Sequence, residues 1–276
     1  MLAQIGVNRI AFKYGLNLPS TLAIAVTPGA SNAEGSWTQV ASAANIAEDI
    51  YYFTLWIKAG STSGQQKDHL LDIGIDPAGG TSYTAIISNI VCGESEVLSG
   101  LQFTFPFFIP AGSSVAVRIQ GSNATAGTVS IGMTFFGQPS HPELIRAGQY
   151  SETIGTITNS GGVTFTPGST DVEGSWVSLG TTSRGLWMWQ LGVQCSAAAI
   201  VGRNYTFDLA YGDGSNKVMI IEDLIILAST NESVQMPVPP SIPFCEVPAG
   251  GELFVRGSCS GTITSGWNAV AVGVGG

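Results

Sequence analysis

The sequence predicts an all-β protein made of two tandem antiparallel β-sandwich domains, jelly-roll-like in type and related by internal duplication. Three observations predict this fold. A set of short motifs occurs twice in the same order, apolar residues alternate with polar ones over several segments, and turn-forming residues separate those segments. The length of 276 residues leaves room for two domains of common sandwich size.

The repeat is the most informative of the three. Residues 27–29 (TPG) and 34–37 (EGSW) recur as residues 166–168 and 173–176, with the same spacing between the two motifs. Residues 71–75 match 207–211, residues 109–112 match 247–250, and Arg118 falls on Arg256 at a similar offset. Small length changes between ordered landmarks are typical of loops that vary around a fixed scaffold. The predicted boundaries are an N-terminal arm at 1–14, a first β-sandwich at 15–137, a linker at 138–153 and a second β-sandwich at 154–276.

Alternation with a period of two predicts the strands, because successive side chains of a strand point to opposite faces. The clearest apolar sets are Tyr51, Phe53, Leu55 and Ile57 in the first unit, and Trp187, Trp189, Leu191 and Val193 in the second. Turn residues lie between such runs at 77–80, 110–112, 212–214 and 248–250. No window of a dozen residues places apolar residues convincingly at the 3.6-residue period of an amphipathic helix, so we expect an all-β chain.

Composition excludes several classes of function. A net charge of −9 argues against nucleic-acid binding, which needs a basic surface. No apolar run reaches the roughly 18 residues that span a membrane, and the first residues do not resemble a secretory signal. Charged residues make up only 11%, which favours a surface of Ser, Thr, Gly and Asn that is partly covered by neighbours in an assembly.

The cysteines and histidines give no sign of a metal site. Cys92, Cys195, Cys245 and Cys259 form no C-x-x-C pair, and the chain has two histidines. We therefore expect no metal and no cofactor. The cysteines are interpreted as reduced, packed thiols, with a disulfide framework as the alternative.

The duplicated Glu and Trp residues are candidates for ligand binding. Trp37 and Trp176 could stack on a sugar face while Glu34 and Glu173 accept protons from its hydroxyl groups. The alternative is that each indole plugs the end of its sandwich while the neighbouring glycine makes a turn.

Asp72 and Asp208 occupy equivalent strand positions, and so do Arg118 and Arg256. Each Asp could pair with its Arg in a functional pocket. The alternative is a structural ion pair or two exposed polar positions.

Three other patterns are weaker. The turns that begin at Asp76 and Asp213 could hold calcium, but they lack the dense acids of a calcium loop and are interpreted as plain turns. Residues 257–261 (GSCSG) have the form of a nucleophile elbow, but they follow a strand in an all-β unit. No catalytic residue is identified, and the sequence predicts that the protein is not an enzyme.

Residues 71–83 (LDIGIDPAGGTSY), followed by 107–113 (FFIPAGS), resemble β-rich structural proteins of tailed bacteriophage virions. The resemblance implies a head decoration (cement) protein, or a neck or tail fibre part, which acts by packing against other virion proteins of the capsid or tail. It also implies location in the virion after synthesis in the host cytoplasm. A homo-oligomer such as a trimer is expected. Two other hypotheses are an adhesin that binds a host glycan and, less favoured, an enzyme that degrades glycans.

Overall fold

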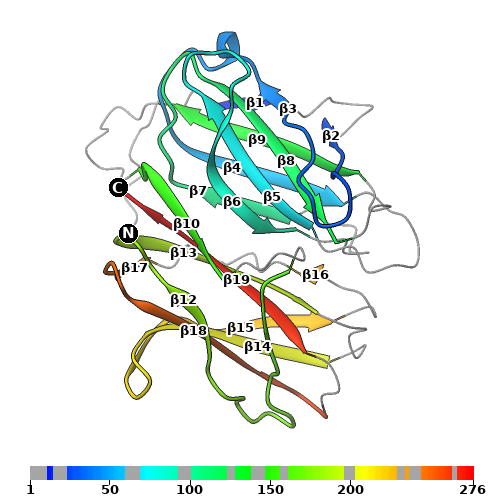
Figure 1. Ribbon diagram of the computed structural model, residues 1–276, viewed down its shortest axis with the longest axis vertical. Helices are drawn as coiled ribbons and strands as arrows, with labels where there is room; N and C mark the ends of the chain where they lie inside the picture. The colour runs from blue at the N-terminus through cyan, green and yellow to red at the C-terminus, as the bar shows by residue number, and fades with distance from the viewer. Residues whose placement is uncertain are drawn as a thin grey trace, which may run out of the picture.

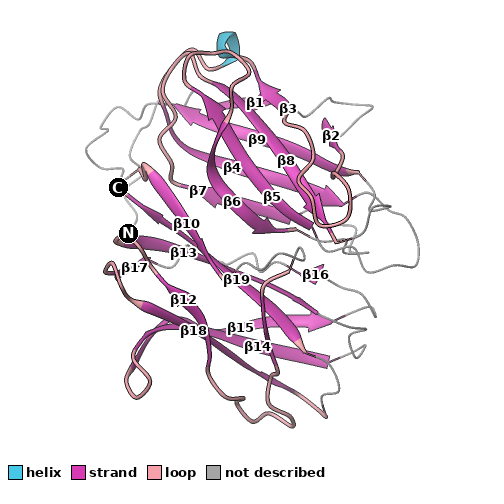
Figure 2. Cartoon of the chain, viewed as in Figure 1, coloured by secondary structure: helices cyan, strands magenta, loops and turns pink. Residues whose placement is uncertain are grey.

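The computed structural model describes residues 11–14, 24–59, 69–92, 101–122, 128–137, 147–155, 161–195, 203–228, 234–235, 244–262 and 266–276. These ranges form antiparallel sheets, and their one helical element is a single 3-10 turn, η1 (Ala43–Asn45). Figure 2 shows the resulting all-strand architecture, which confirms the predicted fold class. Among the described residues, no helix has the length and apolarity needed to cross a membrane.

The first sandwich consists of two sheets that face each other in the upper half of Figure 1. The β9 sheet contains β1 (Ala11–Tyr14), β2 (Ile24–Val26), β4 (Ile50–Ala59), β7 (Leu101–Phe105) and β9 (Val129–Gly137). The β8 sheet has the order β3-β8-β5-β6, with β3 (Thr38–Ala41), β5 (His69–Asp76), β6 (Thr84–Val91) and β8 (Ser114–Gly121).

The second sandwich repeats this plan. Its β19 sheet contains β10 (Tyr150–Ile154), β11 (Val163–Phe165), β13 (Leu186–Cys195), β16 (Val234–Gln235), β17 (Phe244–Val247) and β19 (Trp267–Gly275). Its β18 sheet has the order β12-β18-β14-β15, with β12 (Val177–Thr181), β14 (Arg203–Gly212), β15 (Lys217–Ala228) and β18 (Glu252–Cys259).

Both halves have jelly-roll topology. The order β2-β9-β4-β7 faces the order β3-β8-β5-β6, so the chain crosses between sheets at most of its connections. The second half has the same order with β11-β19-β13-β17 and β12-β18-β14-β15. The prediction of two tandem, duplicated sandwiches of jelly-roll-like type is therefore confirmed.

Two of the predicted segment boundaries need correction. The last four residues of the predicted arm form β1, which pairs with residues 133–136 of β9. The predicted linker at 138–153 includes most of β10, which pairs with residues 271–275 of β19. In both sandwiches a second short strand, β2 or β11, continues along the same edge. The edge of each sheet is thus built from two short strands, and strands of three to five residues are too short to be recognised by their alternation.

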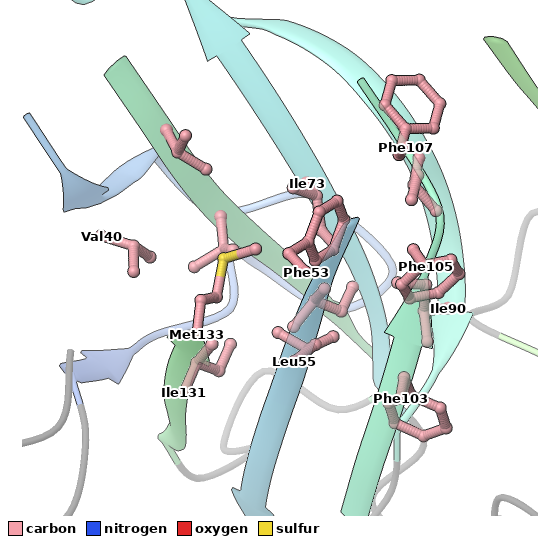
Figure 3. Packing of buried hydrophobic residues seen from close by; sticks show 14 of the residues in the cluster. Val40, Phe53, Leu55, Ile73, Ile90, Phe103, Phe105, Phe107, Ile131 and Met133 are labelled. Atoms are coloured by element: carbon pink, nitrogen blue, oxygen red, sulfur yellow. The ribbon is translucent and has the colours of Figure 1, made fainter. Parts of the chain in front are cut away.

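The predicted alternation places the core. Phe53, Leu55 and Ile57 are buried in the first sandwich, and Trp56 between them is exposed. Figure 3 shows how Phe53 and Leu55 pack with aromatic residues of β7 and with Met133 of β9. In the second sandwich Trp189, Leu191 and Val193 have the corresponding positions, while Trp187 packs with the first core.

Candidate functional site

The candidate site begins with an aspartate and an arginine that face each other across two strands. Asp72 of β5 and Arg118 of β8 are direct partners in the antiparallel register. The Asp72 side chain is 6% exposed, and its Oδ2 atom accepts hydrogen bonds from Arg118 Nε and Nη2, both at 2.9 Å. A buried carboxylate requires such pairing because burial without a counter-charge is costly.

The second oxygen of Asp72 holds an irregularity in the neighbouring strand. Its Oδ1 atom accepts the backbone N–H of Asn89 on β6 at 2.9 Å. Asn89 has a φ of 59°, and the β5–β6 register shifts between Leu71 and Ile73. Such a β-bulge leaves a backbone donor outside the ladder. Asp72 therefore satisfies a freed N–H on one side and a guanidinium on the other.

The second sandwich contains the same arrangement. Asp208 of β14 faces Arg256 of β18, with 2.8 Å between Oδ2 and Nε. Asp208 Oδ1 accepts the backbone N–H of Asp223 at 2.8 Å, and Asp223 has a φ of 51°. The β14–β15 register shifts at the same place. The predicted Asp–Arg pairs are thus both formed, as buried cross-strand ion pairs.

In each sandwich, the Glu–Trp motif contacts the arginine that pairs with the buried aspartate. Glu34 Oε2 forms an ion pair with Arg118 Nη1, and the Arg118 guanidinium lies 4.5 Å from the centre of the Trp37 ring. In the second copy, Glu173 Oε2 is 3.1 Å from Arg256 Nε, and the guanidinium is 4.4 Å from the Trp176 ring centre. We call these four-residue groups the first clasp (Glu34, Trp37, Asp72, Arg118) and the second clasp (Glu173, Trp176, Asp208, Arg256).

The glycine after each glutamate allows the loop to close. A Cβ atom on Gly35 would lie 2.3 Å from the carbonyl oxygen of Thr27, and one on Gly174 would lie 2.8 Å from that of Thr166. At both distances a side chain would force the backbone to shift. Gly35 N–H also donates to the carbonyl of Ile119 at 2.8 Å, which attaches the loop to β8. The repeated Glu-Gly spacing therefore has a packing cause.

The two clasps differ in how the glutamate meets the arginine. Arg118 offers Glu34 a separate Nη1 group. Arg256 meets Glu173 with Nε, whose single hydrogen is already donated to Asp208, and Glu173 Oε2 has no hydrogen-bond partner in the described structure. Burial raises the pKa of Glu34 and of Glu173 in spite of the nearby arginines, which lower it.

The geometry of the clasps suits attachment of the loop to the sheet. Both oxygens of each aspartate already accept hydrogen bonds, and the guanidinium is shared by two carboxylates and an indole. Trp37 also lies against β5, since a Cβ on Gly74 would come within 2.7 Å of its ring. A sugar stacking on the guanidinium side of either indole would have to displace the arginine. Glycan binding by Trp37, Trp176, Glu34 and Glu173 stays a prediction.

The remaining sequence candidates are parts of turns and cores. Asp76 accepts the N–H groups of Ala78 and Ser82, and Asp213 accepts those of Ser215 and Asn216, so both carboxylates serve their own turns. No group of three or more metal-ligating side chains occurs among the residues that the structure describes. Cys259 of the GSCSG stretch is buried and is the last residue of β18.

Three of the cysteines are free thiols: Cys92, Cys245 and Cys259. Burial raises the pKa of the Cys92 thiol, which keeps it protonated. The side chain of Cys195 lies outside the described residues.

Sequence reasoning missed three residues that contact the clasps. Asn89 and Asp223 hold the bulges, and Tyr83 packs beside Trp37 with 5.8 Å between ring centres. The preference of Asn and Asp for left-handed backbone was the available signal. This signal was hidden because Asn89 and Asp223 lie inside runs whose patterns predict regular strands.

No protein-family model and no curated protein matches the chain. Solved structures match at low similarity. Peptide:N-glycanase F is 10% identical to this chain, with a TM-score of 0.38. The match covers 97% of this chain and 96% of the peptide:N-glycanase F chain. The CBM22-1-CBM22-2 tandem domain of Paenibacillus barcinonensis Xyn10C is 10% identical, with a TM-score of 0.28 and coverage of 97% and 91%. A structure of infectious bursal disease virus strain Gx is 9% identical, with a TM-score of 0.23 and coverage of 98% and 71%.

These matches require one correction. Three of the structures are of peptide:N-glycanase F, a peptide-N(4)-(N-acetyl-β-D-glucosaminyl) asparagine amidase. The prediction that this chain is not an enzyme is therefore wrong as it stood, because it rested on finding no catalytic pattern in the sequence, and such a finding does not exclude activity. At 9–12% identity the matches concern the fold, and they assign no reaction or residue to this chain.

Proposed function

We propose that this protein is a structural component of a bacteriophage virion, either a head decoration (cement) protein or part of the neck or tail fibre. In this role it packs against other virion proteins of the capsid or tail. The proposal takes the resemblance of residues 71–83 and 107–113 as its starting point. Jelly rolls are frequent in viral capsid domains, which is an analogy of fold.

The observation that carries the proposal is the way the two sandwiches are joined. Trp187, Met188 and three valines of β19 are buried in the same apolar cluster as the core of the first sandwich. The two domains therefore share buried surface instead of being tethered by a linker alone. A stiff block with two sandwiches suits a protein that transmits contacts between neighbours in a shell.

The proposal is tested on purified particles. Gold-labelled antibody against the folded chain, together with quantitative mass spectrometry, should place it on tailed-phage particles at a constant copy number per particle that survives a high-salt wash. Detection in the host lysate with absence from purified particles would overturn the proposal.

A carbohydrate-binding adhesin is the second candidate. The observation that favours it is aromatic surface, since Trp56 is 39% exposed. Trp37 and Trp176 are half-buried beside glutamates whose side chains are partly exposed. Tryptophan fluorescence should then change on titration with host polysaccharide, and Trp56→Ala or Trp37→Ala should abolish the change. An unchanged spectrum with every glycan on an array would remove this candidate.

A further inference from the structure

The first sandwich docks on the second through its edge strand β6. Ser151 Oγ of β10 donates a hydrogen bond to the carbonyl of Ile86 at 2.6 Å, and Thr153 Oγ1 donates to the carbonyl of Ser88. Val91, which is 2% exposed, lies on Gly192 of β13 so closely that a Cβ there would be 2.8 Å from the valine. The edge of β6 is thus covered by the outer face of the β19 sheet, as the middle of Figure 1 shows.

The duplication identifies the counterpart of each docking residue. Asn89 and Asp223 are equivalent, because both have positive φ and both donate their N–H to the buried aspartate. Two residues further along each strand, Val91 therefore corresponds to Ile225. One residue before the bulge, Ser88 corresponds to Glu222.

The strand register of the β9 and β19 sheets identifies the residue of the first sandwich that corresponds to Gly192. Val26 and Phe165 immediately precede the repeated TPG motif, and they pair with Val129 and Trp267. Val129 pairs with Ala59, the last residue of β4, and Trp267 pairs with Cys195, the last residue of β13. Ala59 and Cys195 are therefore equivalent. Trp56 and Gly192, which lie three residues earlier in each strand, are equivalent as well.

The counterparts of the docked pair are both at the surface. Ile225 is 70% exposed and Trp56 is 39% exposed. Among the described residues, four large hydrophobic side chains are exposed: Trp56, Val172, Val218 and Ile225. Ile225 lies on β15, which is the edge strand of the β18 sheet just as β6 is the edge strand of the β8 sheet. Exposed edge strands with apolar side chains are pairing sites for another chain.

The polar counterparts are oppositely charged. Thr153 pairs with Val272 of β19, and Lys13 has the equivalent position in β1, opposite Thr134 of β9. The intrachain contact between Thr153 and Ser88 therefore corresponds to Lys13 and Glu222. Lys13 has an ammonium group where Thr153 has a hydroxyl, and Glu222 has a carboxylate where Ser88 has a hydroxyl, so the two positions carry opposite charges, which favours association of the two surfaces.

We propose that the β15 edge of one copy of this chain docks on the outer face of the β9 sheet of a second copy, repeating the contact that joins the two sandwiches. Ile225 then packs on the Trp56 indole, and the strand position of Glu222 lies opposite the strand position of Lys13. Trp56 is bulkier than Gly192, so the two surfaces lie further apart than in the intrachain contact. The indole and the isoleucine fill the difference.

The two surfaces differ, so the contact is heterologous. Repetition of such a contact gives a closed ring or an open filament instead of a two-fold dimer. The proposal rests on the repeat and not on the virion assignment. A protein that self-associates but is absent from particles would contradict the proposed function alone.

Sedimentation velocity of the purified full chain over a wide concentration range tests the proposal. The wild-type protein should shift to larger species as concentration rises. Ile225→Lys should raise the concentration at the midpoint about tenfold or more, because a charge replaces the central apolar contact. Val172→Lys is the matched control, since Val172 is also exposed but lies outside the proposed contact. It should behave as the wild type.

Charge reversal provides a second reading that does not depend on one variant. Glu222→Lys and Lys13→Glu should each weaken association, and the double variant should restore it. Circular dichroism and thermal unfolding confirm that every variant folds. A wild-type protein that stays monomeric at all concentrations, equal effects of I225K and V172K, or no restoration in the double variant would each overturn the proposal.

Discussion

The edge strands β6 and β15 are counterparts in the two sandwiches, and they differ in their surroundings. Each carries a bulge held by a buried aspartate. Two residues after the bulge, Val91 is covered by the second sandwich while Ile225 is open to solvent. The duplication keeps the clasp and the strand order, which both lie within a single sandwich. What differs is the use of the surface beside them.

Among the changes that test this comparison, removal of a clasp should have the largest effect on stability. Asp208→Ala leaves the Asp223 N–H without its acceptor, and it leaves Arg256 with the contact between Nε and Glu173 as its remaining carboxylate contact in the clasp. We expect a loss of about 3 kcal/mol in the free energy of unfolding, at the lower end of the range for broken buried pairs because Arg256 is partly exposed. Asp72→Ala should cost less, since Glu34 still pairs with Arg118 through Nη1. Urea unfolding measures both.

The exposed turn residue Asp213 supplies the control for these variants, because Asp213→Ala removes a carboxylate from a surface turn and not from a core. Its effect should be clearly smaller. Equal losses for the variants at Asp72, Asp208 and Asp213 would show that the clasps do not stabilise the sandwiches.

The close approach of the loop should give the next effect. Gly35→Ala places a Cβ 2.3 Å from a backbone oxygen, and Gly174→Ala places one at 2.8 Å. We expect a loss of about 2–3 kcal/mol for the first and less for the second, because backbone atoms cannot move aside easily. Gly214→Ala, where nothing lies within 4 Å, should be nearly neutral. Thermal unfolding ranks the three, and a reversed order would refute the packing explanation.

The joint between the sandwiches should respond to a smaller change. Gly192→Ala introduces a methyl group against Val91, and we expect a loss of about 1–2 kcal/mol with earlier unfolding of one sandwich in calorimetry. Trp56→Leu, at the equivalent position of the first sandwich, should change stability by no more than about 0.5 kcal/mol in dilute solution. If both variants unfold as the wild type does, the docked edge contributes nothing to the joint.

The smallest effect is a dependence on pH. Burial raises the folded-state pKa of Glu34 and Glu173, so the folded protein binds these protons more tightly than the unfolded chain. Their contribution to stability is therefore present below the ordinary glutamate pKa of 4.5 and is lost as the pH rises through the raised values. Glu34→Gln should flatten that fall.

For Asp213 we expect the opposite dependence of stability on pH. Backbone hydrogen bonds from Asn216 and Ser215 lower its pKa, so its contribution is present above the ordinary aspartate value of 3.8 and is lost as the pH falls through the lowered pKa. Unfolding curves of E34Q and D213N across the acidic range should diverge from the wild type in opposite directions. Divergence in the same direction would contradict these assignments.

Much of the fold could be predicted from the sequence because the duplication supplied two readings of one pattern. The alternation around Phe53 and Trp189 placed the core strands, and the Asp72 and Arg118 repeats proved to be cross-strand partners. The short strands β1 and β10 were assigned to the arm and the linker, since a strand of four or five residues carries too little alternation. The attachment of Glu34 to Arg118 depends on a loop folding over β8, which no local pattern encodes.

Inter-copy cross-linking tests the central claim, that the second sandwich leaves open a surface that the first uses inside the chain. Trp56→Cys and Ile225→Cys variants are purified separately, mixed and oxidised, with Val172→Cys as the control partner. We expect a disulfide-linked dimer between the Trp56 and Ile225 variants, and none between the Trp56 and Val172 variants. Cross-links that form equally with either partner, or only within the Ile225 variant, would contradict it.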